Sequence, residues 1–73
     1  MLLTIELNKK HPKIDISFDS EGLDLLIKKL EVIRKSKSHD HFMTESWAGN
    51  ELTEKKQKAD STLIHQVDLR YIA

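Results

Sequence analysis

The chain has 73 residues, which allow one small domain over 1–73, and a domain of this size buries only roughly 60% of the surface that its unfolded chain exposes. Its twelve basic and twelve acidic residues cancel, so it lacks the broad positive field on which non-specific binding to nucleic acid or to a membrane surface depends. With no cysteine, and no apolar run of signal-peptide or membrane-span length, it is expected to be a cytoplasmic protein without disulfides or thiolate metal sites.

The first eighteen residues predict a β-hairpin with one apolar face. Residues 2–7 alternate between two faces, and residues 13–18 do the same, which is the period of a strand. The apolar face contains Leu3, Ile5, Leu7, Ile14, Ile16 and Phe18. Pro12 belongs in the connection, because proline cannot donate to a strand ladder.

A single helix is predicted from about residue 20 to residue 36. Asp19 can cap its start, and Glu21 puts a negative charge in the first turn, where it meets the positive end of the helix dipole. Gly22 is tolerable in this first turn. Apolar residues then recur at helical spacing: Leu23, Leu26, Ile27, Leu30 and Ile33. This stripe suits a helix that lies across a sheet.

Two more strands are expected after the helix, one over 39–44 and one over Leu63 to Ile72. The connection at 45–61 is polar, with Leu52 as a lone apolar anchor. The elements together predict an α+β fold of order ββαββ. If the helix returns the third strand beside the first, one four-stranded antiparallel sheet results, in the order 2-1-3-4. The helix packs on one face of this sheet and leaves the other face uncovered.

The uncovered face is expected to be polar enough to remain in water. Its polar residues are Thr4, Glu6, Asp15, Ser17, Gln66, Asp68 and Arg70. Leu2, Phe42, Ile64 and Ile72 share the same parity and could form an apolar island. A homodimer, or contact with another protein, could use this island or the edge strands.

Three histidines raise the alternative of a metal site or of a histidine-based enzyme. His39 and His41 point to one face of a strand, and His65 on the last strand could supply a third zinc ligand. Spacing fixes no carboxylate to this site, and paired histidines on a sheet face more often pack or hydrogen-bond. A histidine base beside a hydroxyl would also lack an orienting residue and an oxyanion turn. We therefore expect no metal, no cofactor and no catalytic residue.

Residues 38–53, SHDHFMTESWAGNELT, contain the only Trp of the chain and no Lys or Arg. Two interpretations of Trp47 are open. It folds back as a plug of the core, or it anchors an interface, since Trp is enriched at binding hot spots and a rim of acids steers a basic partner. The second interpretation predicts a protein-binding surface on 40–54 formed by Asp40, Glu45, Trp47, Asn50, Glu51 and Glu54.

Three segments together carry a resemblance to a known family. They are Asp19-x-Glu21-Gly22-Leu23-x-x-Leu26-Ile27, His39-Asp40-His41-x-Met43-Thr44-x-x-Trp47-x-Gly49-x-Glu51-Leu52 and Leu63-Ile64-His65-x-Val67. Their order and spacing resemble the Immunity protein 32 family of bacterial polymorphic toxin systems over nearly the whole chain. The resemblance implies a cytoplasmic inhibitor without catalytic residues, which protects the producing cell by binding a toxin encoded beside it. Many immunity proteins are strongly acidic, whereas this chain is neutral. We therefore expect the electrostatic contact with the toxin to come from the local acidic segment and not from the charge of the whole chain.

We therefore expect a toxin-neutralising immunity protein that binds its cognate toxin directly and blocks the active site or the substrate path of the toxin. The alternatives are a small histidine-based metal-binding protein or enzyme, and a self-associating structural domain. The gene neighbourhood separates these functions, because a toxin domain encoded immediately upstream supports neutralisation.

Overall fold

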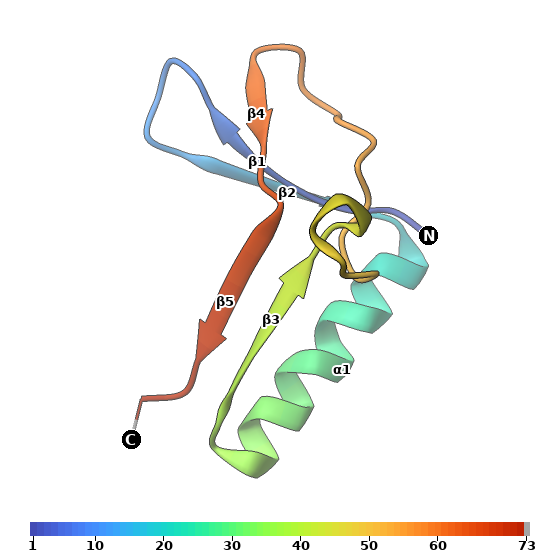
Figure 1. Cartoon of the computed structure of the whole chain (residues 1–73), viewed down its shortest axis with the longest axis vertical. Helices are drawn as coiled ribbons and strands as arrows, with labels where there is room; N and C mark the ends of the chain where they lie inside the picture. Colours follow the sequence, from blue (N-terminus) through green and yellow to red (C-terminus); the bar gives the residue numbers. More distant parts are fainter. Residues whose placement is uncertain (73) are drawn as a thin grey trace.

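The computed structural model describes residues 1–72 and has the predicted α+β class (Figure 1). Among these residues there is one α-helix, one short 3-10 helix and five strands, all of which pair antiparallel. The elements are β1 (Leu3–Asn8), β2 (Ile14–Phe18), α1 (Ser20–Ser36), β3 (His39–Met43), η1 (Glu45–Trp47), β4 (Ser61–Leu63) and β5 (Gln66–Arg70). The hairpin and the bounds of the helix agree with the sequence prediction.

The strands form two sheets instead of the single four-stranded sheet that the sequence predicts. One sheet has the order β2-β1-β4 and the other pairs β3 with β5. The predicted fourth strand breaks in the middle, because the Ile64 N–H donates to the Ile5 carbonyl (2.8 Å), whereas the next carbonyl, that of His65, accepts from the Thr44 N–H (2.9 Å). The last strand thus leaves β1 and continues along β3. The two halves of the last strand therefore lie between β1 and β3, whereas the predicted order 2-1-3-4 places β1 and β3 side by side. Figure 1 shows β4 and β5 running nearly end to end.

The helix is closed at both ends by local contacts. Asp19 accepts a hydrogen bond from the Gly22 N–H (2.8 Å), and Lys37 takes the left-handed conformation (φ 51°) while its N–H donates to Ile33 (2.8 Å). Gly22 and Ile33 are buried, whereas the stripe of Leu23, Ile27 and Leu30 stays exposed. Only part of the predicted apolar stripe therefore covers the rest of the domain. No helix within residues 1–72 is long and apolar enough to cross a membrane.

The core lies where the hairpin, the helix and the β3–β5 ribbon meet. Its buried residues are Leu3, Ile5, Phe42 and Leu52, and the partly buried Leu25, Leu26, Ile64, Val67 and Leu69 pack against them. The apolar island expected on the uncovered face does not form: Phe42 is buried, Leu2 and Ile64 are half-buried, and only Ile72 is strongly exposed. The expectation was wrong because Phe42 packs in the core with Leu3 and Ile5, on the side of β3 that faces α1, where the Lys29 ammonium lies 5.8 Å from the centre of its ring.

Two polar residues of β1 are also inside the molecule, contrary to the expectation of a water-facing polar face. Thr4 and Glu6 are fully buried. The segment 55–60 crosses this face, and the Glu6 carboxylate accepts hydrogen bonds from the N–H groups of Gln57 and Lys58 (3.1 Å each) and from the Ser61 hydroxyl (2.7 Å). A residue that looks like a surface acid in the sequence therefore anchors the long connection.

Candidate functional site

Trp47 is presented by a tight turn that follows β3. The Thr44 carbonyl accepts hydrogen bonds from the N–H groups of Trp47 (3.0 Å) and Gly49 (2.9 Å), which closes the turn around η1. Ala48 completes it in the left-handed conformation, with φ 67°. Leu52 then donates its N–H to the Met43 carbonyl (3.1 Å) and enters the core. The backbone of 44–52 is thus held at several points, and the indole has a defined position.

The Trp47 indole stacks on the His65 ring and leaves its other side to solvent. The ring centroids are 5.6 Å apart and the planes differ by 4°. The His65 ring is itself held, because its Nδ1 lies 2.7 Å from the hydroxyl of buried Thr44. With 51% of its surface exposed, Trp47 is not a plug of the core. It is a rigid aromatic side chain at the surface.

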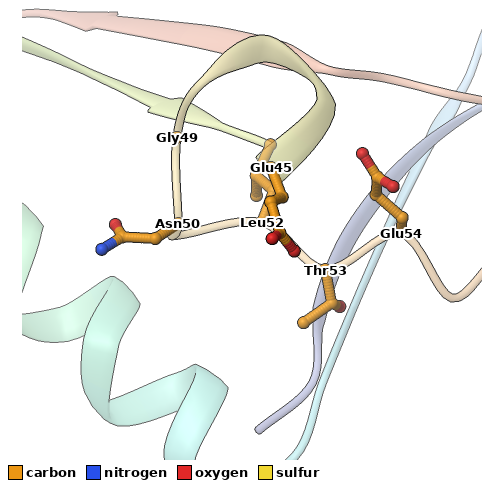
Figure 2. Close-up of a pocket in the computed structure, with 6 residues that line it drawn as sticks. All are labelled: Glu45, Gly49, Asn50, Leu52, Thr53 and Glu54. Atoms are coloured by element: carbon orange, nitrogen blue, oxygen red, sulfur yellow. The ribbon is translucent and has the colours of Figure 1, made fainter.

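A surface hollow of about 500 Å³ lies beside this turn (Figure 2). Its lining residues are Glu45, Gly49, Asn50, Leu52, Thr53 and Glu54. Figure 2 shows both carboxylates at this loop, with the Asn50 amide extending to the other side. Because the lining includes two acids and no basic residue, the hollow is suited to a cationic group.

The carboxylates of this region differ in how they are held. Glu54 Oε1 accepts a hydrogen bond from the Ser46 N–H (3.0 Å) and lies 3.8 Å from His65 Nδ1. Hydrogen bonds from the side chain and the backbone of Ser46 hold the pKa of Glu54 below its usual value, so this group stays ionised. Glu51 accepts from the neighbouring Asn50 N–H (2.7 Å), and Glu45 is exposed at the start of η1. The local charge is therefore negative at neutral pH.

Asp40, the remaining predicted site residue, lies apart from the others. It faces α1 and pairs with Lys29, whose Nζ is 3.1 Å from Asp40 Oδ2. The N–H of His41 and the Lys29 ammonium hold the pKa of Asp40 below its usual value. Asp40 contributes to a different hollow, between α1 and β3, which Leu25, Lys28, Lys29 and Val32 also line. The structure thus brings together the predicted residues from 45 to 54 and separates Asp40 from them.

The histidines are distributed over different surroundings. His39 and His41 are exposed on β3, opposite Arg70 and Asp68 of β5, whereas His65 is engaged with Thr44 and Trp47. Residues 1–72 contain no group of three or more His, Cys, Asp or Glu side chains that could hold a metal ion.

The contacts of His65 also do not form a catalytic relay. In such a relay one ring nitrogen faces the nucleophile and the other faces the orienting acid. Here the Thr44 hydroxyl and the nearest Glu54 oxygen both approach Nδ1 of His65, and the hydroxyl is buried. The Thr44 hydroxyl instead holds the His65 ring in place, and this ring supports the Trp47 indole.

The residues that support the site carry no recognisable signal in the sequence. Thr44 and His65 position the indole, and Thr53 joins the loop to β1 by accepting from the Leu3 N–H (3.1 Å) and donating its own N–H to the Leu3 carbonyl (2.7 Å). In the sequence, His65 suggests only a metal ligand. Its place between Ile64 and Gln66, where the strand breaks, gives no local signal that it lies under a Trp eighteen residues earlier.

No family model, no curated protein and no solved structure matches this chain.

Proposed function

We propose that this protein is an immunity protein that neutralises the cognate toxin of a bacterial polymorphic toxin system by direct binding, in the cytoplasm and without catalysis. The observation that carries the proposal is the half-exposed Trp47, which is stacked on His65 beside a hollow lined by Glu45 and Glu54. A large rigid aromatic next to uncompensated acids is the composition of a binding hot spot for a basic protein surface. The sequence resemblance to the Immunity protein 32 family points to the same function.

The proposed contact uses each part of the site differently. The exposed side of the indole packs on an apolar or cationic side chain of the toxin, because Trp buries a large apolar area and is the best aromatic partner for a cation. A Lys or Arg of the toxin enters the hollow between the two acids. Toxins that act on nucleic acid need a basic cleft for their substrate, and an inhibitor that fills this cleft blocks the path of the substrate. Neither the indole nor the carboxylates need to react with anything.

Replacing Trp47 by Ala tests this contact. We expect the affinity for the toxin domain encoded beside the gene to fall by about 2 kcal/mol or more, roughly thirtyfold, and protection of cells that produce the toxin to fall with it. The stack on His65 contributes only about 1 kcal/mol to stability, so the melting temperature should fall by only several degrees. Titration calorimetry and thermal unfolding on the same variant separate the two effects.

Tyr71→Ala is the matched control, because Tyr71 is another exposed aromatic residue and lies outside 45–54. It should leave the affinity unchanged. If Trp47→Ala stays folded and binds the toxin at wild-type strength, the proposed surface is wrong.

Charge reversal at an acidic residue of the hollow tests the electrostatic part of the proposed contact. Glu45→Lys should slow association with the toxin and make the rate less sensitive to salt, because a rim charge acts mainly on the encounter. Asp24→Lys makes the same change of charge on the exposed side of α1 and should alter the association rate much less. Stopped-flow measurements at two salt concentrations compare them. Equal effects of the two variants would mean that net charge, and not this surface, steers the toxin.

A further inference from the structure

The strand β2 is a free edge with apolar side chains. It pairs with β1 on one side, and no strand within residues 1–72 pairs with its other side. Ile14, Ile16 and Phe18 are all exposed, although each lies opposite a residue of β1 on the apolar face of the hairpin. An exposed edge of this kind is a template for another strand, and monomeric proteins usually protect it with charges or proline. Within β2 the only charged residue is Asp15.

The free backbone groups of β2 belong to its apolar residues. The Asn8 N–H donates to the Lys13 carbonyl (3.0 Å), and the Asp19 N–H donates to the Leu2 carbonyl (3.1 Å). Because hydrogen-bonded pairs alternate along an antiparallel ladder, the backbone groups of Asp15 and Ser17 also face β1. The N–H and C=O groups of Ile14, Ile16 and Phe18 therefore point away from β1, toward the open edge.

The chain also exposes more surface than a compact monomer of its mass. Its solvent-accessible surface is 5236 Å², whereas about 4,650 Å² is expected for a folded monomer of 8.5 kDa. Its radius of gyration is 12.6 Å, against about 11.2 Å expected for a compact chain of this length. The excess surface, about 600 Å², approaches the roughly 800 Å² that each partner buries in a standard-size interface.

We propose that two copies of this chain pair through β2, antiparallel and around a two-fold axis at Ile16, to form a continuous six-stranded sheet. In this register Ile16 faces Ile16 of the second copy, and Ile14 faces Phe18 of the second copy. These are the hydrogen-bonded pairs, so all the outward backbone groups of Ile14, Ile16 and Phe18 find partners. The apolar faces of the two hairpins become one surface.

Charge selects this register over its neighbours. In an antiparallel pair, two directly opposed side chains lie on the same face of the sheet. Two identical strands related by a two-fold axis meet this condition only if one residue lies on the axis and faces its own copy. An axis at Asp15 would bring two carboxylates together, and an axis at Ser17 would put Asp15 opposite Asp19. The axis at Ile16 instead puts Lys13 opposite Asp19 of the second copy, which is an attractive pair.

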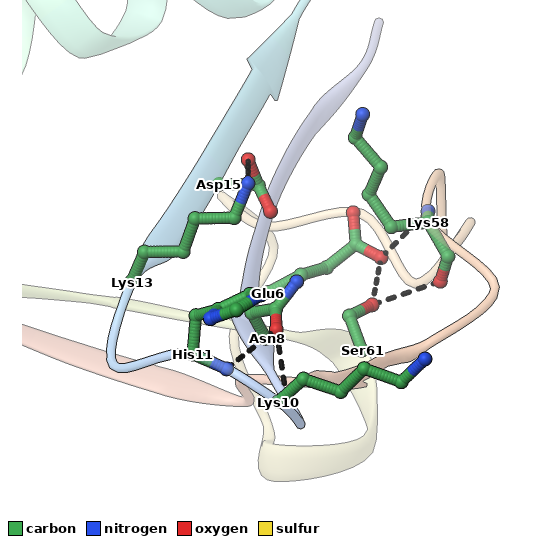
Figure 3. Close-up of polar contacts among 8 residues, drawn as sticks. All are labelled: Glu6, Asn8, Lys10, His11, Lys13, Asp15, Lys58 and Ser61. Atoms are coloured by element: carbon green, nitrogen blue, oxygen red, sulfur yellow. Dashed lines mark hydrogen bonds and ion pairs between the residues drawn. The ribbon is translucent and has the colours of Figure 1, made fainter.

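The same register places a hydroxyl next to a carboxylate that is not fully hydrogen-bonded within one chain. Asp15 Oδ2 is buried and has no hydrogen-bond partner within residues 1–72, while Asp15 Oδ1 lies 3.9 Å from Lys13 Nζ (Figure 3). In the proposed pairing Asp15 lies opposite Ser17 of the second copy, in a non-hydrogen-bonded pair, where side chains come closest. Because Oδ2 is buried within one chain, the Ser17 hydroxyl can donate to it only after the Asp15 carboxyl group rotates this oxygen toward the edge. The dimer uses no residue from 45 to 54, so it does not depend on the proposed function.

A single cysteine tests the register, because the chain has no cysteine of its own. In an antiparallel hydrogen-bonded pair the two Cα atoms are about 5.5 Å apart, which a disulfide can span. Ile16→Cys should therefore give a covalent dimer under mild oxidation. Ile14→Cys alone should not, but a mixture of Ile14→Cys and Phe18→Cys should give the crosslinked heterodimer. Crosslinking of Ile14→Cys to itself, or none for Ile16→Cys, would overturn the register.

Sedimentation measurements test the association itself with a matched pair of variants. Ile16 and Ile27 are equally exposed, at 49% each, but Ile27 lies on α1 and outside the β2 edge. We expect a dimer for the wild type at high micromolar concentration, a monomer for Ile16→Lys and a dimer for Ile27→Lys, with circular dichroism confirming that each is folded. A monomeric wild type would overturn the proposal. So would equal dissociation of both variants, because the association would then not use the strand edge.

Discussion

Glu6 shows how one buried carboxylate can organise a segment that is distant in the sequence. Figure 3 shows it among the groups of the connection that it binds, and the partners Gln57, Lys58 and Ser61 lie more than fifty residues away. Hydrogen bonds to an ionised acceptor are roughly twice as strong as neutral ones. Glu6 therefore ties the connection to β1 more firmly than packing alone would.

Replacing Glu6 by Gln should destabilise the fold by about 2 kcal/mol or more. The amide keeps one acceptor but presents an NH₂ group to backbone donors that then lose their partner in a buried place. Urea unfolding at neutral pH measures the loss. Glu31→Gln is the control, because Glu31 is exposed and its pair with Arg34 is a surface ion pair, so less than about 1 kcal/mol is expected. A Glu6→Gln variant as stable as Glu31→Gln would contradict this role.

The same carboxylate predicts the response of stability to acid. Burial alone would raise the pKa of Glu6, but the hydrogen bonds from Ser61, Lys58, Gln57 and Thr4 together outweigh burial and lower it. A lowered pKa in the folded state means that Glu6 contributes stability above its unfolded pKa, near 4.3, and loses this contribution as pH falls through the folded value. The stability difference between the wild type and Glu6→Gln should therefore shrink below about pH 4. A difference that stays constant in urea unfolding down to pH 3 would exclude this linkage.

At the scale of elements, Gly22 fixes how closely α1 approaches the backbone of Leu2, the residue that precedes β1. A Cβ at this position would clash with the Leu2 carbonyl oxygen and would press on Phe18. Gly22→Ala in an exposed helix would gain about 1 kcal/mol of helix propensity, but here the helix and the strand must separate, which costs typically 1–3 kcal/mol. We expect a net loss of stability in thermal unfolding. Asp24→Ala, in the exposed part of the same helix, should be nearly neutral, and a stabilised Gly22→Ala would refute the close approach.

The elements themselves follow from the sequence, but their partners do not. Asp19 and the spacing from Leu23 to Ile33 predict α1 within a residue, because caps and periodicity are local signals. The apolar residues around 63–72 predict a strand there, but periodicity does not say which neighbour a strand pairs with. The exchange of neighbours at Ile64 and His65 depends on Ile5 and Thr44, and no local pattern encodes it.

The candidate site was predictable only in part for the same reason. The missing positive charges and the single Trp mark 40–54 in the sequence, and the structure places the residues from 45 to 54 around one turn and one hollow. Asp40 belongs to the same sequence segment, but it lies on β3, where its side chain faces α1 and pairs with Lys29. Proximity in sequence therefore predicts which residues share the loop but not the neighbours of Asp40, which lies on a strand. That the loop is a binding surface stays a prediction.

For the whole molecule, pairing through β2 makes stability depend on concentration. If only the folded chain dimerises, mass action stabilises the folded state as the protein concentration rises. We expect the melting temperature of the wild type to increase by a few degrees for each tenfold rise in concentration, and that of Ile16→Lys to stay constant. Differential scanning calorimetry over a hundredfold range makes the comparison. A constant melting temperature for the wild type would exclude a dimer that contributes to stability.

Because the last strand is shared between the two sheets, neither sheet can be completed during synthesis before the C-terminal residues emerge. Both sheets are completed by residues from Ser61 onward, since β4 closes onto β1 and β5 closes onto β3. The pairing of Asn8 with Ser61 and the contacts of Glu6 with 57–61 each close a loop of about fifty residues, and such long-range contacts form slowly. A nascent chain that has released only the hairpin and α1 from the ribosome holds the unpaired second edge of β1, an uncovered Leu25 and Leu26, and an unpartnered Glu6. Its period of greatest exposure to aggregation and to proteases ends only when the residues through β5 emerge.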